Sequence, residues 1–98
     1  MLLSHAVTLA EARSYLAALA DRARTFDASI EYERVLLQLD SIHGDHIPAL
    51  TPVPVTNRDL LVHLARAAIE ELLGHGVDAL HIELVLAMLE AAREKDEP

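Results

Sequence analysis

Histidine is the residue type in this chain that is best suited to chemistry, and four of the six histidines occur as two close pairs. His43 and His46 flank Asp45, and His75 and His81 surround a short glycine turn. Imidazole and carboxylate groups are common transition-metal ligands. His43, Asp45 and His46 therefore form one candidate metal or small-ligand site, and His75 and His81 form another.

Neither histidine pair has the spacing of a recognised metal-binding motif. A catalytic zinc site generally needs three converging protein ligands, and three ligands within residues 43–46 would be strained. His43 also has an ordinary structural explanation, because a protonated histidine near the C-terminus of a helix interacts favourably with the helix dipole. The sequence therefore predicts no bound metal and no other cofactor, and the two histidine groups stay as alternatives.

Other reactive groups are missing from the sequence or lack a catalytic context. The chain has no cysteine, which excludes thiolate nucleophiles, disulfides and cysteine-type zinc sites. The serines lie outside any nucleophile-elbow sequence, and no glycine-rich phosphate loop is present. We therefore expect a protein that is not an enzyme.

The charge of the chain argues against nucleic acids and membranes as partners. Sixteen acidic and eight basic residues give a formal net charge of −8, which repels phosphate backbones and anionic lipid surfaces. The longest apolar run, 84–89, is far shorter than the roughly 20 residues of a membrane-spanning helix. The N-terminal residues lack the basic region and apolar length of a signal peptide. We expect a cytoplasmic protein that binds neither nucleic acid nor membrane.

The elements that must position the histidines are predicted to be helices. Hydrophobic residues make up 52% of the chain but aromatic residues only 3%, and the abundant leucine and alanine favour helices. Apolar periodicity and capping residues place helices at about 8–24, 28–43, 57–73 and 78–94. The predicted fold is an all-α, four-helix, up-down bundle that forms a single domain over residues 1–98.

Capping residues set the predicted helix ends. The signals are Thr8 with Glu11 for the start of the first helix, Gly44 for the end of the second, Thr56 with Asp59 for the start of the third, and Asp78 for the start of the fourth. The break between the first two helices depends only on the capping-type residues of segment 25–29. One long helix that fuses the two is therefore the alternative.

The connector 44–56 and the tail 95–98 are predicted to lie outside the helices. Three of the four prolines hold the connector extended, and the charged tail is expected to fray. In an alternating bundle, His43 and His75 lie at opposite ends. They meet only if the connector crosses the length of the bundle.

The third and fourth helices carry more apolar surface than a small bundle needs. Their apolar residues span roughly 220° of each helix, against about 100° for an ordinary surface helix. His81 falls in the middle of this arc. We expect a homodimer to cover the surplus, unless the connector folds over it. The residues predicted to contribute to the interface are Ile30, Leu37, Leu61, Leu72, His81, Val85, Met88 and Leu89.

These features predict a non-enzymatic module for protein-protein interaction or regulation, which forms a homodimer and could bind a further protein. The alternative is a helical bundle that binds a small ligand or metal through one of the two histidine groups. The first prediction rests on the apolar faces of the helices, and the second rests on imidazole chemistry.

Overall fold

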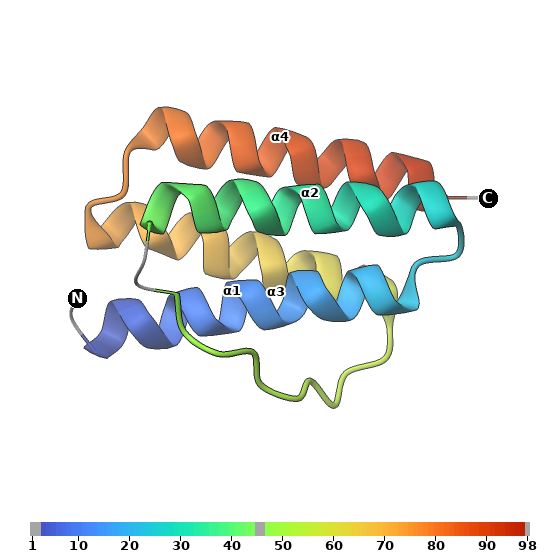
Figure 1. The fold of residues 1–98 in the computed structure, drawn as a ribbon, viewed down its shortest axis with the longest axis horizontal. Coiled ribbons are helices and arrows are strands. Elements are labelled where there is room, and N and C mark those ends of the chain that lie inside the picture. The colour runs from blue at the N-terminus through green and yellow to red at the C-terminus, as the bar shows by residue number, and fades with distance from the viewer. Residues whose placement is uncertain (1–2, 45–46, 98) are drawn as a thin grey trace.

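The residues that the structure describes fold into four α-helices and one short 3-10 helix (Figure 1). The computed structural model describes residues 3–44 and 47–97. The elements are α1 (Leu3–Arg22), α2 (Phe26–His43), α3 (Arg58–Glu71), the 3-10 helix η1 (Leu72–His75) and α4 (Ala79–Asp96). No strand occurs within the described residues, and the predicted all-α bundle is confirmed. Among these residues, no helix has the combination of length and apolar character that crossing a bilayer requires.

The helix directions follow the order up, down, down, up, in place of the alternating order that we expected. α1 and α2 are antiparallel, and the connector then runs along the bundle so that α3 starts beside the end of α1 (Figure 1). Arg58 at the start of α3 donates a hydrogen bond over 3.2 Å to the carbonyl of Arg22 at the end of α1. The path of the connector therefore places the C-termini of α2 and α3 at the same end of the bundle.

α1 and α2 are separate helices, so the alternative of one fused helix is wrong. Thr25 is extended between them, with φ −126° and ψ 155°, and its side-chain oxygen accepts a hydrogen bond from the amide of Ala28. The Ser29 hydroxyl donates to the Ala20 carbonyl over 2.8 Å. The capping residues in the sequence mark a true break, and α2 begins at Phe26, slightly earlier than predicted.

The start of α1 was predicted wrongly. α1 begins at Leu3, so Thr8 lies inside the helix and the predicted Thr8 capping box does not form. The buried Thr8 hydroxyl instead donates to the carboxylate of Glu71, 3.2 Å away at the end of α3. The Thr8 side chain, which the local sequence predicted to cap α1, therefore bonds to a residue of another helix.

The remaining helix ends follow the predicted signals in part. Gly44 ends α2 with φ 62°, and the Asp78 side chain caps α4, both as predicted. α3 is capped by Asn57 in place of Thr56. α4 continues to Asp96, which is buried, so the predicted frayed tail is wrong as far as that residue.

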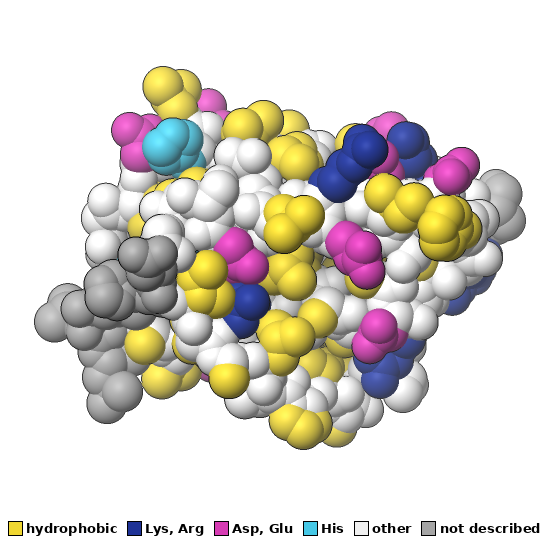
Figure 2. Space-filling model, viewed as in Figure 1, with side chains coloured by type: hydrophobic (Ala, Val, Ile, Leu, Met, Phe, Trp, Pro, Cys, Tyr) yellow, Lys and Arg dark blue, Asp and Glu magenta, His cyan; other side chains and the backbone are white. Residues whose placement is uncertain are grey.

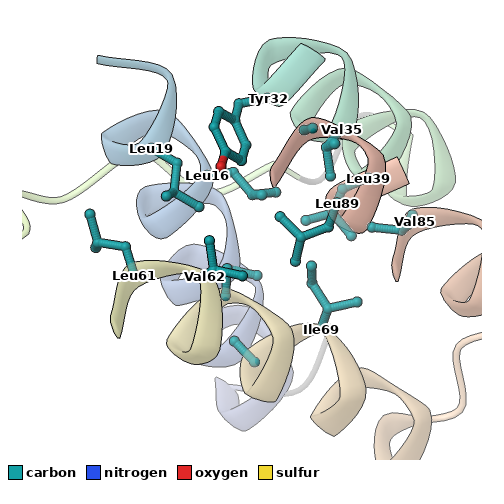
Figure 3. Packing of buried hydrophobic residues seen from close by; sticks show 14 of the residues in the cluster. Leu16, Leu19, Tyr32, Val35, Leu39, Leu61, Val62, Ile69, Val85 and Leu89 are labelled. Atoms are coloured by element: carbon teal, nitrogen blue, oxygen red, sulfur yellow. The ribbon is translucent and has the colours of Figure 1, made fainter. Parts of the chain in front are cut away.

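One core made mainly of leucine and alanine lies between the helices (Figure 3). Burial of each large aliphatic side chain contributes roughly 1.5–3 kcal/mol to stability. The radius of gyration of 12.4 Å is close to the value of about 12.6 Å for a compact chain of this length. The large, fully buried side chains are Leu9, Leu16, Leu19, Tyr32, Val35, Leu39, Leu61, Ile69, Leu72, Ile82, Val85 and Leu89.

The connector is fastened to α1 by polar contacts. Arg13 pairs with Asp40, with Nε and Oδ1 2.7 Å apart, and also donates to the carbonyl of Pro48. The Ser14 hydroxyl accepts a hydrogen bond from the Thr51 amide over 3.0 Å. Val53 packs against the core, but other apolar side chains of the connector stay exposed. The polar contacts of the connector are therefore with α1, and part of its own apolar surface stays exposed.

Candidate functional site

Three histidines from three elements meet at one end of the bundle. His5 of α1 lies with its ring centre 5.2 Å from that of His43 in α2 and 5.3 Å from that of His75 in η1. We call these three residues the histidine cluster. The expectation that His43 and His75 lie at opposite ends is thus wrong, because the connector crosses the bundle.

Each ring of the histidine cluster has a buried nitrogen without a hydrogen-bond partner among the described residues. These atoms are Nδ1 of His5, Nε2 of His43 and Nδ1 of His75. The other nitrogen of His43, Nδ1, lies 2.9 Å from the Leu39 carbonyl. A carbonyl can only accept, so Nδ1 of His43 carries the proton and the buried Nε2 presents a lone pair.

The surroundings of His5 favour its neutral form. Burial lowers the pKa of His5 from its ordinary value of 6.5, and the neighbouring His43 and His75 lower it further. Desolvation and nearby positive charge both disfavour protonation of an imidazole. His5 therefore presents an uncharged nitrogen donor to a ligand.

The cluster differs from both histidine sites predicted from sequence. His43 and His75 each belong to a predicted group, but they join one another and not their sequence neighbours. His81 is exposed on α4, which corrects its expected place in the middle of a buried apolar face. Asp45 and His46 lie outside the described residues.

His5 was missed because its segment was not expected to be helical. Extending the helical spacing backwards from Leu9 and Ala12 places His5 on the same buried side, one turn earlier. The apolar seam of α1 therefore contained a signal for His5. Its partners could not be found in this way, because they depend on the path of the connector.

The structure divides the predicted interface residues between core and surface. Leu61, Leu72, Val85 and Leu89 have 0% exposure and belong to the core of the single chain. Ile30 and Met88 are partly buried, His81 is exposed, and Leu37 is 66% exposed. Only the second group can reach a partner without unfolding.

A polar pocket of about 620 Å³ occupies the opposite end of the bundle. Its lining includes Arg24, Tyr32, Arg58, Arg93 and Asp96. The nearly buried carboxylate of Asp96 accepts a hydrogen bond over 2.7 Å from the amide of Arg24 and lies 3.7 Å from Nε of Arg58. Because its carboxylate is already partnered, Asp96 serves to tie the last turn of α4 to the turn between α1 and α2.

Tyr32 completes this polar network from the core side. Its hydroxyl donates to the second carboxylate oxygen of Asp96 over 3.5 Å. Burial raises the pKa of Tyr32 to about 12, and the charge and hydrogen bond of Asp96 act in the same direction. The protonated phenol is therefore part of the folded structure.

Comparison with known proteins assigns no family to this chain. It matches no protein-family model, no curated protein and no solved structure.

Proposed function

We propose that this protein is a non-enzymatic interaction module that forms a homodimer through the outer surface of α2 and α4. The observation that carries the proposal is the exposure of large aliphatic side chains on both helices. Leu37 of α2 is 66% exposed, and Leu80 and Leu84 of α4 are 74% and 47% exposed. Exposed apolar residues that adjoin one another are typical of an interaction surface.

α2 has apolar side chains on two opposite sides. Tyr32 and Leu39 point into the core. Ile30 and Leu37 are seven residues apart and therefore share the other side of the helix. A helix with a second apolar side can contact a partner while it remains packed in its own bundle.

α4 carries a matching stripe beside α2. Leu80, Leu84 and Met88 recur every four residues, which places them along one side of the helix. An ion pair between Lys95 and Glu31, 3.4 Å long, joins the two helices. We group Ile30, Leu37, Leu80, Leu84 and Met88 of these two neighbouring helices as the α2/α4 face. Figure 2 shows hydrophobic side chains interspersed with charged side chains on the visible side of the molecule.

The surface between α3 and α4 is less suitable than the sequence suggested. Arg66 and Glu90 form an ion pair across this seam. Leu61 and Leu72 are fully buried in the core of the chain and cannot contact a partner. The proposed interface therefore keeps α4 and the predicted residues Ile30 and Leu37 of α2, and it leaves out α3.

A second copy of the chain is the partner that fits the α2/α4 face best. Its charged neighbours have both signs, with Arg34 and Lys95 exposed close to Glu31 and Glu33. In a two-fold symmetric contact, each cation of one copy can face an acid of the other. The aliphatic residues supply the affinity, and the charged rim sets the orientation.

Light scattering coupled to gel filtration tests the proposal. We expect a mass twice the 10.8 kDa of one chain, and we expect Leu37→Glu and Leu84→Glu to give monomers because each places a charge in the apolar contact. Leu60→Glu is the matched control, since Leu60 is 44% exposed on α3. A monomeric wild type, or equal disruption by the control, would contradict the proposed interface.

A further inference from the structure

We propose that the histidine cluster, His5, His43 and His75, binds one divalent transition-metal ion of the zinc class. The three rings come from α1, α2 and η1 and meet at the end of the bundle away from the polar pocket. This proposal is independent of the α2/α4 face, which contains none of the three residues.

The ring spacing matches that of imidazoles that share a metal ion. With a zinc-nitrogen bond of about 2.0–2.1 Å and tetrahedral angles, two coordinating rings have their centres about 5 Å apart. The two ring-centre distances from His5 are 5.2 Å and 5.3 Å. The distance from the His5 ring to each of the other two rings therefore matches the distance between two rings that coordinate one zinc ion.

Binding requires the rings of His5 and His75 to turn, while the hydrogen bond to Leu39 holds the ring of His43. The rings are tilted by 41° and 58° to that of His5, and no group of three or more His, Cys, Asp or Glu side chains in the described part of the chain could hold a metal ion with the side chains as they lie. Rotation about the side-chain torsions reorients a ring while its helix stays in place. The three buried nitrogens, which have no hydrogen-bond partner among the described residues, would then share the metal ion as their partner.

The hydrogen bond of His43 is the kind that supports a metal ligand. Metal-binding histidines almost always donate their second ring N–H to a carbonyl, carboxylate or water, which fixes the tautomer and the ring orientation. Nδ1 of His43 donates to the Leu39 carbonyl in this way and directs the free lone pair to Nε2. A buried lone pair with no donor needs a cation or a water to be satisfied.

The donor set selects the class of ion. Three imidazole ligands suit zinc, copper, nickel and iron, whereas magnesium and calcium prefer oxygen ligands. The three histidines are only partly buried, which leaves room for a water as a further ligand. The net charge of −8 on the chain also favours a cation over an anionic ligand.

Calorimetric titration of the untagged chain with Zn²⁺ tests the site. We expect saturation at one ion per chain, and at least tenfold weaker binding in each of His5→Ala, His43→Ala and His75→Ala. The matched controls are His63→Ala and His81→Ala, both at exposed positions, and we expect wild-type affinity from them. Equal loss in the controls, or no saturable binding by the wild type, overturns the proposal.

A measurement on the wild type keeps the test valid if a variant fails to fold. The side-chain NMR signals of the six histidines can be followed as one equivalent of Zn²⁺ is added. We expect the ring signals of His5, His43 and His75 to shift with a coordinated nitrogen, and those of His63 and His81 to stay in place. Shifts confined to other histidines would show that the cluster is not the binding site.

Discussion

At the scale of single residues, the roles of two buried polar side chains, Asp96 and Tyr32, depend on the groups that they contact. Asp96 is charged and nearly buried, yet its oxygens meet a backbone amide, an arginine and the hydroxyl of Tyr32. Burial of a charge is tolerated when such partners replace water. The ring of Tyr32 contributes apolar surface to the core, and its hydroxyl must stay protonated to donate to Asp96.

The titration of Tyr32 provides a test at this scale. In Tyr15→Phe, Tyr32 is the only tyrosine, and we expect its absorbance to report ionisation near pH 12 in the folded protein. Because the folded pKa lies above the ordinary value of 10.0, its contribution is complete below pH 10 and is lost as the pH rises towards 12. The loss is on the order of 3 kcal/mol. Ionisation near pH 10 without unfolding would contradict the buried hydrogen bond.

At the scale of elements, the connector decides the arrangement more than any helix does. The helices form from their own periodicity and capping residues, but their order of directions depends on residues 44–57. Contacts of Arg13 and Ser14 with the connector hold it along α1. A short turn in this place would have given the alternating bundle and would have separated His43 from His75.

The cap of α3 can be tested by comparing two adjacent residues. Asn57→Ala removes the side chain that accepts from the Leu60 amide over 3.0 Å, and we expect it to lower the free energy of unfolding by about 1 kcal/mol. Thr56→Ala is the control, and we expect a change within about 0.5 kcal/mol. Urea denaturation measures both variants. A larger effect at Thr56 would return the helix start to the residue that the sequence first indicated.

At the scale of the whole molecule, net charge and apolar surface have opposite effects on association. Each copy carries −8, so two copies repel one another, while the α2/α4 face provides a hydrophobic contact. Ion pairs at an exposed rim contribute little to affinity. The long-range repulsion should therefore dominate the response of the dimer to salt.

Salt dependence of the dimer follows from this balance. We expect the dissociation constant of the dimer to fall several-fold when the ionic strength rises from about 20 mM to about 150 mM. The reason is that screening by salt shortens the range of the repulsion between the two copies. Sedimentation equilibrium measures the constant, and sucrose at equal osmolality serves as the control. Weakening of the dimer by salt would mean that ion pairs, and not aliphatic contacts, hold it together.

Local sequence signals determined the helical class of this protein and many of its helix ends. Leucine and alanine spacing indicated the core faces, and Thr25, Gly44 and Asp78 are found at helix ends as their types indicate. These features depend on interactions within a few residues, which a sequence displays directly. The prediction for Thr8 was wrong because its hydrogen-bond partner, Glu71, is distant in sequence.

Tertiary structure alone decided which histidines meet and which apolar residues stay exposed. His5, His43 and His75 come together because the connector crosses the bundle, and no local pattern encodes that crossing. Leu61 and Leu37 are equally apolar, yet one is fully buried and the other is mostly exposed. The side of a helix that faces a neighbour depends on where the neighbour lies, so periodicity gives the faces of a helix and packing selects among them.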